Sequence, residues 1–205
     1  MFVRRIIRDG FPLSWSFNGL PADDSLVIKR ENLTDEIWEL WSESNFVIMS
    51  GPAATGKTSL MELVSNKNRF KYWVAHYVYI RLNTEISPLE LLKRSGIDLE
   101  EKTVTLNPSC ESNTNIFILF DDAQLGYSFE SDWRTLMTDG DVLEFLERKH
   151  IRFFIAATYL YGNSTLGSHV AFISLSGIKP NSLLLSRDES VEILEKRLGS
   201  GFKDF

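Results

Sequence analysis

Apolar runs alternate with polar, helix-forming stretches along most of this chain. Runs rich in apolar, aromatic or β-branched residues occupy residues 46–50, 75–82, 115–120, 152–158 and 170–176. Such runs are typical of strands buried on both faces of a parallel sheet, and the segments between them predict helices. Strands that alternate with helices predict an α/β fold of three layers, in which a mostly parallel sheet of about five strands is flanked by helices.

Polar residues indicate where the expected helices begin. Thr34 is a candidate cap for a helix over residues 35–43, whose apolar positions form one stripe. Three further helices are expected to begin at capping boxes, in which a polar residue is followed three positions later by an acid. These boxes are Ser87 with Glu90, Asp141 with Glu144, and Ser186 with Glu189. The last of them predicts a helix over residues 187–198.

Length and composition predict a single domain. The chain has 205 residues, 43% of them hydrophobic, which is enough for one substantial core. Residues 1–20 show no sustained period and contain two glycines and a proline, so we expect an irregular N-terminal extension. Residues 21–180 are expected to form the core domain. Residues 181–205 are expected to be the start of a C-terminal helical lid that is truncated.

Charge and cysteine content argue against several classes of function. The net charge of −6 and the isoelectric point of about 5.2 give no overall reason to expect binding to nucleic acids or membranes. The single cysteine, Cys110, cannot form an internal disulfide, and no Cys/His cluster has zinc-binding spacing. The apolar pieces near the N-terminus are too short for a signal peptide or a membrane span.

Residues 51–58 give the strongest chemical signal in the chain. They follow the strand expected at residues 46–50 and read Gly-Pro-Ala-Ala-Thr-Gly-Lys-Thr, which matches the Walker A phosphate-binding motif. Such a loop presents backbone N–H groups to phosphate oxygens, and the helix that follows adds the positive end of its dipole. The expected nucleotide-binding residues here are Gly51, Pro52, Ala53, Ala54, Thr55, Gly56, Lys57, Thr58 and Ser59.

A second motif lies at the end of the strand expected at residues 115–120, where Asp121 and Asp122 follow the apolar run. The carboxyl end of a central parallel strand would lie beside the phosphate loop, so the pair is interpreted as a Walker B motif. We expect Lys57 to contact the β- and γ-phosphates and Thr58 to ligate Mg²⁺. Asp121 would hold the metal through water, and Asp122 would polarise the attacking water.

These motifs predict Mg²⁺-dependent binding and slow hydrolysis of a nucleoside triphosphate. ATP is expected over GTP, because the two further motifs of small GTPases are not properly formed. The glycine expected three positions after the acid lies four positions after Asp122, at Gly126. Residues 66–69 read Asn-Lys-Asn-Arg and therefore lack the aspartate that recognises guanine.

The arrangement around the motifs resembles the AAA+/STAND class of ATPases. In that class an Arg-Glu pair before the first helix, here Arg30 and Glu31, lies near the adenine. The resemblance implies that Thr158, at the end of the strand after Walker B, senses the γ-phosphate and belongs to the catalytic residues. It also implies that Arg148 or Arg152 reaches a neighbouring subunit, so that the chain associates with itself.

A narrower resemblance is to the NTPase module of Crinkler-type effectors. It is carried by residues 120–127, which read Phe-Asp-Asp-Ala-Gln-Leu-Gly-Tyr, by Trp133, and by Tyr-Leu-Tyr-Gly at residues 159–162. Asp122 stands where that family has glutamate. The resemblance implies a nucleotide-dependent switch or motor module of a larger effector-like protein, with a host protein or an attached nuclease-like domain as partner. It further implies secretion and a location in the host nucleus.

Three alternative functions stay open at this stage. A small-molecule or nucleoside kinase shares the Walker A motif, although residues 159–168 contain no arginine for a phosphate-clamping lid. A nucleotide-binding interaction module that does not hydrolyse is a second alternative, because Asp122 is shorter than glutamate. A GTPase is the third.

Overall fold

The computed structural model describes most of the chain and contains one large, mostly parallel sheet. The described residues are 4–8, 11–13, 28–53, 55–67, 75–106, 115–158, 176–178 and 183–198. Within them, seven strands form the sheet in the order β2-β1-β4-β7-β8-β3-β9. The strands are β1 (Arg4–Arg8), β2 (Phe11–Leu13), β3 (Phe46–Ser50), β4 (Ala75–Arg81), β7 (Asn115–Asp121), β8 (Ile151–Ala157) and β9 (Ser176–Ile178). Within this sheet of described strands, the pairing of β1 with β2 is antiparallel and the other pairings are parallel.

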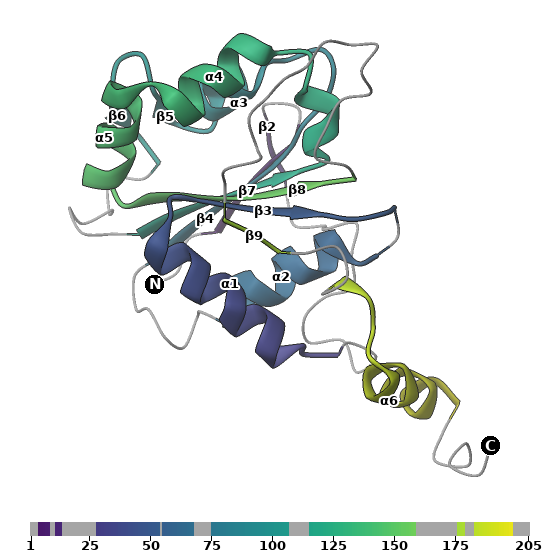
Figure 1. The fold of residues 1–205 in the computed structure, drawn as a ribbon. Helices are drawn as coiled ribbons and strands as arrows, with labels where there is room; N and C mark the ends of the chain where they lie inside the picture. The colour runs from purple at the N-terminus through teal and green to yellow at the C-terminus, as the bar shows by residue number, and fades with distance from the viewer. Residues whose placement is uncertain are drawn as a thin grey trace.

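Helices cover both faces of this sheet, which gives three layers (Figure 1). One face carries α1 and α2, and the other carries α3, α4 and α5. The helices are α1 (Glu31–Glu43), α2 (Lys57–Lys67), α3 (Pro88–Arg94), α4 (Glu130–Thr138), α5 (Gly140–Arg148) and α6 (Arg187–Leu198). A short hairpin of β5 (Ile97–Asp98) and β6 (Thr103–Val104) and a 3₁₀ turn, η1 (Ala123–Gly126), complete the elements. In the described part of the chain, no helix combines the length and apolarity needed to cross a membrane.

The predicted α/β architecture with a mostly parallel sheet and flanking helices is confirmed, with corrections at both edges. The irregular N-terminal extension is wrong for Arg4–Arg8 and Phe11–Leu13, because β1 pairs in parallel with β4 and β2 pairs with β1. Of the fifth strand expected at residues 170–176, all but Ser176 lie outside the described residues, and β9 begins at Ser176. The sheet therefore exceeds the expected five strands.

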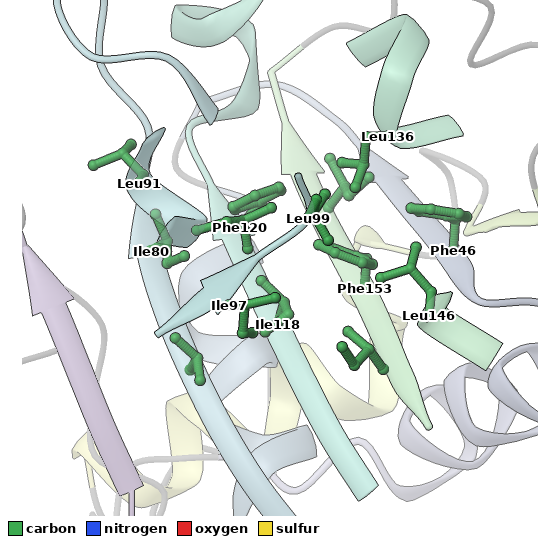
Figure 2. Close-up of a cluster of buried hydrophobic side chains, with 14 of the residues drawn as sticks. Phe46, Ile80, Leu91, Ile97, Leu99, Ile118, Phe120, Leu136, Leu146 and Phe153 are labelled. Atoms are coloured by element: carbon green, nitrogen blue, oxygen red, sulfur yellow. The ribbon is translucent and has the colours of Figure 1, made fainter. Parts of the chain in front are cut away.

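Two apolar cores explain why the central strands read as continuous hydrophobic runs. Alternate residues of β7 point to opposite faces: Ile118 and Phe120 belong to the core beneath α3, α4 and α5, whereas Phe117 and Leu119 belong to the core beneath α1 and α2. Figure 2 shows side chains of the first core, with Phe120 on β7 near Phe153 on β8. A strand buried on both faces needs apolar residues at every position, since neither face contacts water.

The observed helix caps confirm some of the helix starts predicted from the sequence and correct others. The Ser186 and Glu189 box is reciprocal: each backbone N–H donates to the side chain of the other residue, over 2.7 and 3.1 Å. The cap at Thr34 is wrong, because α1 begins at Glu31 and the Thr34 hydroxyl donates to the Glu31 carbonyl inside the first turn. The box at Asp141 is also wrong, because the side chain that caps α5 is that of Asp139.

The correction at α5 leads to a stability prediction. Asp139 Oδ1 accepts hydrogen bonds from the backbone N–H groups of Asp141 and Val142, whereas the Asp141 carboxylate makes an exposed ion pair with Lys102. Loss of an N-cap costs about 1 kcal/mol, and an exposed ion pair contributes less. We therefore expect Asp139→Ala to lower the free energy of unfolding by about 1 kcal/mol and Asp141→Ala to leave it almost unchanged. Urea denaturation of both variants measures the difference, and equal losses would contradict the Asp139 cap.

Candidate functional site

Four parallel strands end at one edge of the sheet, and the motif residues gather there. The carboxyl ends of β3, β8, β7 and β4 lie side by side in the strand order, because all neighbouring pairs among them are parallel. β3 is followed by the loop of residues 51–56, β7 ends in Asp121, and β8 is followed by Thr158. In open parallel sheets, ligands bind in the crevice outside the carboxyl ends of the strands.

The loop after β3 is shaped by two glycines. Gly51 donates its N–H to the Ala157 carbonyl at 3.2 Å, and a Cβ atom at this position would stand 2.7 Å from the Leu183 side chain. Gly56 has a φ of 81°, a left-handed conformation that other residues rarely adopt. Between them, Pro52 and Ala53 are exposed, and Thr55 donates its hydroxyl to the Pro52 carbonyl at 2.9 Å. Ala54 lies outside the described residues.

Lys57, the first residue of α2, turns back over this loop. Its ammonium group donates to the carbonyl oxygens of Gly51 at 2.8 Å and Pro52 at 2.7 Å. Burial lowers the pKa of Lys57, and the nearby carboxylates of Asp121 and Asp122 act in the opposite direction. A partly buried cation whose partners are mainly neutral carbonyls is well suited to accept an anion at this loop. Ser59, two residues further along α2, is also partly buried.

Asp121 is the centre of a buried hydrogen-bond network that joins the two sequence motifs. Its Oδ2 atom accepts from the Thr58 hydroxyl and from the Tyr79 phenol, each at 2.7 Å. Its Oδ1 atom accepts from the backbone N–H of Asp122 at 3.0 Å. Burial and the charge of Asp121 raise the pKa of the Tyr79 phenol, so Tyr79 stays a proton donor to this carboxylate at neutral pH.

Asp122 belongs to a second, more exposed network on the same edge. Its backbone is left-handed, with φ 54° and ψ 38°, a conformation that aspartate tolerates better than most residues. One carboxylate oxygen accepts from Arg81 Nε at 2.7 Å, and the other accepts from Gln124 Nε2 at 3.3 Å. Gln124 Oε1 in turn accepts the backbone N–H of Thr158 at 2.9 Å. The two carboxylates of the acid pair therefore have separate partners.

The donor set around Asp121 fits a magnesium ion. Mg²⁺ prefers hard oxygen ligands and is usually held by one or two protein oxygens together with phosphate oxygens and water. The Thr58 hydroxyl and the Asp121 carboxylate supply two such oxygens side by side. In the described part of the chain there is no group of three or more His, Cys, Asp or Glu residues that could hold a metal ion.

A cavity of about 660 Å³ lies between the start of α1 and the segment before α6. Its walls include Ile28, Leu33, Leu184 and Leu185, together with the polar residues Arg30, Glu31, Asn32, Glu36, Ser186 and Glu189. Leu183, which precedes Leu184 of the cavity wall, packs so near Gly51 that a Cβ atom there would stand 2.7 Å from its side chain. One wall of the cavity is therefore continuous in the chain with a residue that packs beside the loop of residues 51–56.

Arg30 joins the two walls of this cavity. Its guanidinium donates to the carbonyl oxygens of Leu183 and Leu184, each at 3.1 Å, and to the carboxylate of Glu189 at 3.0 Å. Although partial burial acts in the opposite direction, hydrogen bonds from Ser186 and Arg30 lower the pKa of Glu189. The sequence predicts that Arg30 lies near the adenine, and Arg30 does line this cavity. Its guanidinium, however, donates hydrogen bonds to groups of the protein itself.

The two candidate subunit-bridging arginines lie away from this edge. Arg152 is near the amino end of β8, where it donates to the Trp41 carbonyl at 2.8 Å and to Asn115 Oδ1 at 3.1 Å. Arg148 is exposed at the last position of α5. Neither is brought to Lys57 or Asp121 within the chain, and self-association through them stays a prediction.

Sequence reasoning missed Tyr79 and Arg81, which are the partners of the two acids. Both lie on one side of β4 near its carboxyl end, and the register places Arg81 opposite Asp121. A signal was present in the sequence, because polar residues at the end of the strand at 75–82 interrupt an otherwise apolar run. Only the adjacency of β4 and β7 reveals that these residues face the acid pair.

Other residues of the narrower resemblance have packing roles. Trp133 is fully buried and donates its indole N–H to the Gly126 carbonyl at 2.8 Å, and its ring contacts Tyr127 and Phe120 edge to face. These contacts fix the 3₁₀ turn that carries Gln124. Residues 159–162 lie outside the described residues.

Comparison of the whole sequence with models of protein families and with curated proteins finds no match.

Proposed function

We propose that this protein binds a nucleoside triphosphate with Mg²⁺, prefers ATP, and hydrolyses it slowly. The proposal includes a P-loop NTPase fold, with residues 51–58 as the phosphate loop and Asp121 and Asp122 as the acids of Walker B. A protein of this kind acts as a nucleotide-dependent switch or motor module. Partners, secretion and location in a host cell are left as implications of the Crinkler resemblance.

One contact carries the proposal: the hydrogen bond of 2.7 Å between the Thr58 hydroxyl and the Asp121 carboxylate. These residues are 63 positions apart in the chain and were assigned to one magnesium site from two separate motifs. Chance matches to a phosphate-loop pattern have no reason to lie beside a strand-end acid. The contact therefore supports the joint interpretation of both motifs.

The described residues suit the steps that hydrolysis requires. Among the described residues, Lys57 donates to loop carbonyls, which it can exchange for phosphate oxygens, whose charge makes the hydrogen bonds stronger. Bound Mg²⁺ supplies charge neutralisation and orientation of the phosphates. Asp122 is the candidate for polarising the attacking water, and Gln124 links it to Thr158, the candidate γ-phosphate sensor.

The nucleotide base is proposed to occupy the cavity between α1 and the segment before α6. Its apolar walls suit the faces of a purine, and its adjacency to the loop of residues 51–56 matches a base attached to phosphates bound there. Because the sequence lacks the aspartate-bearing motif that would pair with guanine, adenine is expected to bind more tightly.

The preference for ATP is expected to be about tenfold, or about 1.4 kcal/mol, because the open cavity leaves part of the base in water. Competition between labelled ATP and unlabelled GTP at equal Mg²⁺ measures this ratio. A tighter constant for GTP would identify a GTPase in spite of the missing motifs.

Calorimetric titration with ATP, ADP and GTP, with and without Mg²⁺, tests the proposal when it is followed by an assay for free phosphate. Mg²⁺-dependent binding with slow phosphate release supports it. The absence of triphosphate binding would overturn it.

A nucleotide-binding module without hydrolysis is a second candidate. It is favoured by the hydrogen bonds of both Asp122 oxygens, with Arg81 and with Gln124, because these donors stabilise the carboxylate and make it a weaker base toward water. Tight Mg²⁺-dependent binding without phosphate release would identify this function.

A further inference from the structure

Arg81 is a cation at the candidate phosphate site with unused hydrogen-bonding capacity. It ends β4 and reaches Asp122 through Nε only, over 2.7 Å. Its two terminal guanidinium nitrogens make no hydrogen bond with any other described residue. The side chain is 37% exposed, so these donors are accessible. An arginine has five N–H donors in a planar fork, a geometry that matches the oxygens of a phosphate.

Arg81 and Lys57 are two cations near the acid pair, and each is hydrogen-bonded to the protein itself. Both Asp121 and Asp122 act on the pKa values of Lys57 and Arg81, so the four charged groups form one cluster. Each cation is bound to an acceptor of the protein itself: Lys57 to the carbonyls of residues 51 and 52, and Arg81 to the Asp122 carboxylate. Phosphate oxygens are stronger acceptors than the backbone carbonyls that bind Lys57. A phosphate group also carries more negative charge than the carboxylate that binds Arg81.

We propose that Arg81 binds the terminal phosphate of the triphosphate and exchanges the Asp122 carboxylate for it when the triphosphate binds. The inference rests on the proposed function and deepens it by assigning a phosphate ligand that no sequence motif indicated. The exchange is energetically reasonable, because a partly exposed ion pair contributes little stability and a bidentate contact between arginine and phosphate contributes more.

The exchange makes Arg81 a discriminator between triphosphate and diphosphate. With a diphosphate there is no terminal phosphate to bind, and Arg81 stays on Asp122. With a triphosphate, the Oδ2 atom of Asp122 is released, while its Oδ1 atom keeps its link to Gln124 and through it to Thr158. The acid that is proposed to polarise water therefore becomes available only when a substrate is bound.

The test compares the affinities of the unmodified protein, Arg81→Gln and Arg81→Lys for two probes by calorimetry in Mg²⁺. The probes are ADP and the non-hydrolysable β,γ-imido analogue of ATP. Arg94→Gln is the matched control, since Arg94 Nε also donates to a carboxylate at 2.7 Å but does so on α3, with a side chain 42% exposed. Thermal melts without nucleotide establish that each variant is folded.

Arg81→Gln is expected to weaken binding of the triphosphate analogue by about 10- to 100-fold, the range for hydrogen bonds to a charged group, and to change ADP binding by less than about threefold. Arg81→Lys keeps the charge but not the fork, so its loss should be intermediate, and Arg94→Gln should lose nothing. Equal affinity changes for both probes, or no change in a folded Arg81→Lys, would overturn the exchange while leaving the proposed function intact. If the unmodified protein binds neither probe, the proposed function fails and the inference fails with it.

Discussion

Replacement of Lys57 by alanine is expected to abolish most triphosphate binding without unfolding the protein. Within the part of the chain that the structure describes, the ammonium group donates to two carbonyls of the neighbouring loop and to no group of the sheet or the cores. With a triphosphate it would lie among phosphate oxygens, and two hydrogen bonds to charged groups correspond to about 100-fold or more in affinity. Thermal melts with and without MgATP measure both properties, since a ligand at 100 times its Kd adds about 2.7 kcal/mol of stability.

Lys93→Ala is the control for this experiment. Lys93 also makes a hydrogen-bonded contact within the chain, with the Asp98 carboxylate at 2.9 Å, but it lies on α3 and more than half of its side chain is exposed. This variant should keep the full stabilisation by MgATP. If Lys57→Ala is stabilised as much as the unmodified protein, the nucleotide binds elsewhere or does not need this lysine.

The central architecture was predictable from the sequence because it depends on burial. Strands buried on both faces require continuous apolar runs, so β3, β4, β7 and β8 were all located within one or two residues. The short strands β1 and β2, which lie beyond β4 at one side of the sheet, were missed, because their pairing depends on the accessible edge of β4 and not on a local pattern. The cap of α5 was missed because both Asp139 and Asp141 suit an N-cap, and their residue types do not decide between them.

The candidate site likewise contains residues that local motifs predict and residues whose role depends on the order of the strands. Lys57, Thr58 and the acid pair were predicted because the chemistry of a phosphate loop imposes a fixed local spacing. Tyr79 and Arg81 come from β4, and their relation to the acids depends on the strand order, which local spacing does not encode. The structure adds these two partners, and they differ for each acid: two hydroxyl donors hold Asp121, whereas an arginine and an amide hold Asp122.

Because of this difference, we expect substitution of Asp121 to affect nucleotide binding and substitution of Asp122 to affect the rate of hydrolysis. Asp121→Asn removes the charge next to the Thr58 hydroxyl, so we expect a marked loss of Mg²⁺-dependent nucleotide binding and little change in binding without the metal. Asp122→Asn should leave triphosphate affinity unchanged or slightly tighter, because Arg81 loses its competing partner. Its turnover should fall by about 100-fold or more, the usual effect of removing a group that accepts a proton in the reaction.

Nucleotide titrations over a range of Mg²⁺ concentrations, together with phosphate release under saturating ATP, distinguish these outcomes. Asp141→Asn is the control for loss of one carboxylate charge, since its side chain is 80% exposed and pairs with Lys102 on the hairpin side of the molecule. Hydrolysis by Asp122→Asn at the unmodified rate would show that Asp122 does not activate the water. Gln124 would then be the group to replace next, because it contacts both Asp122 and Thr158 at the carboxyl edge of the sheet.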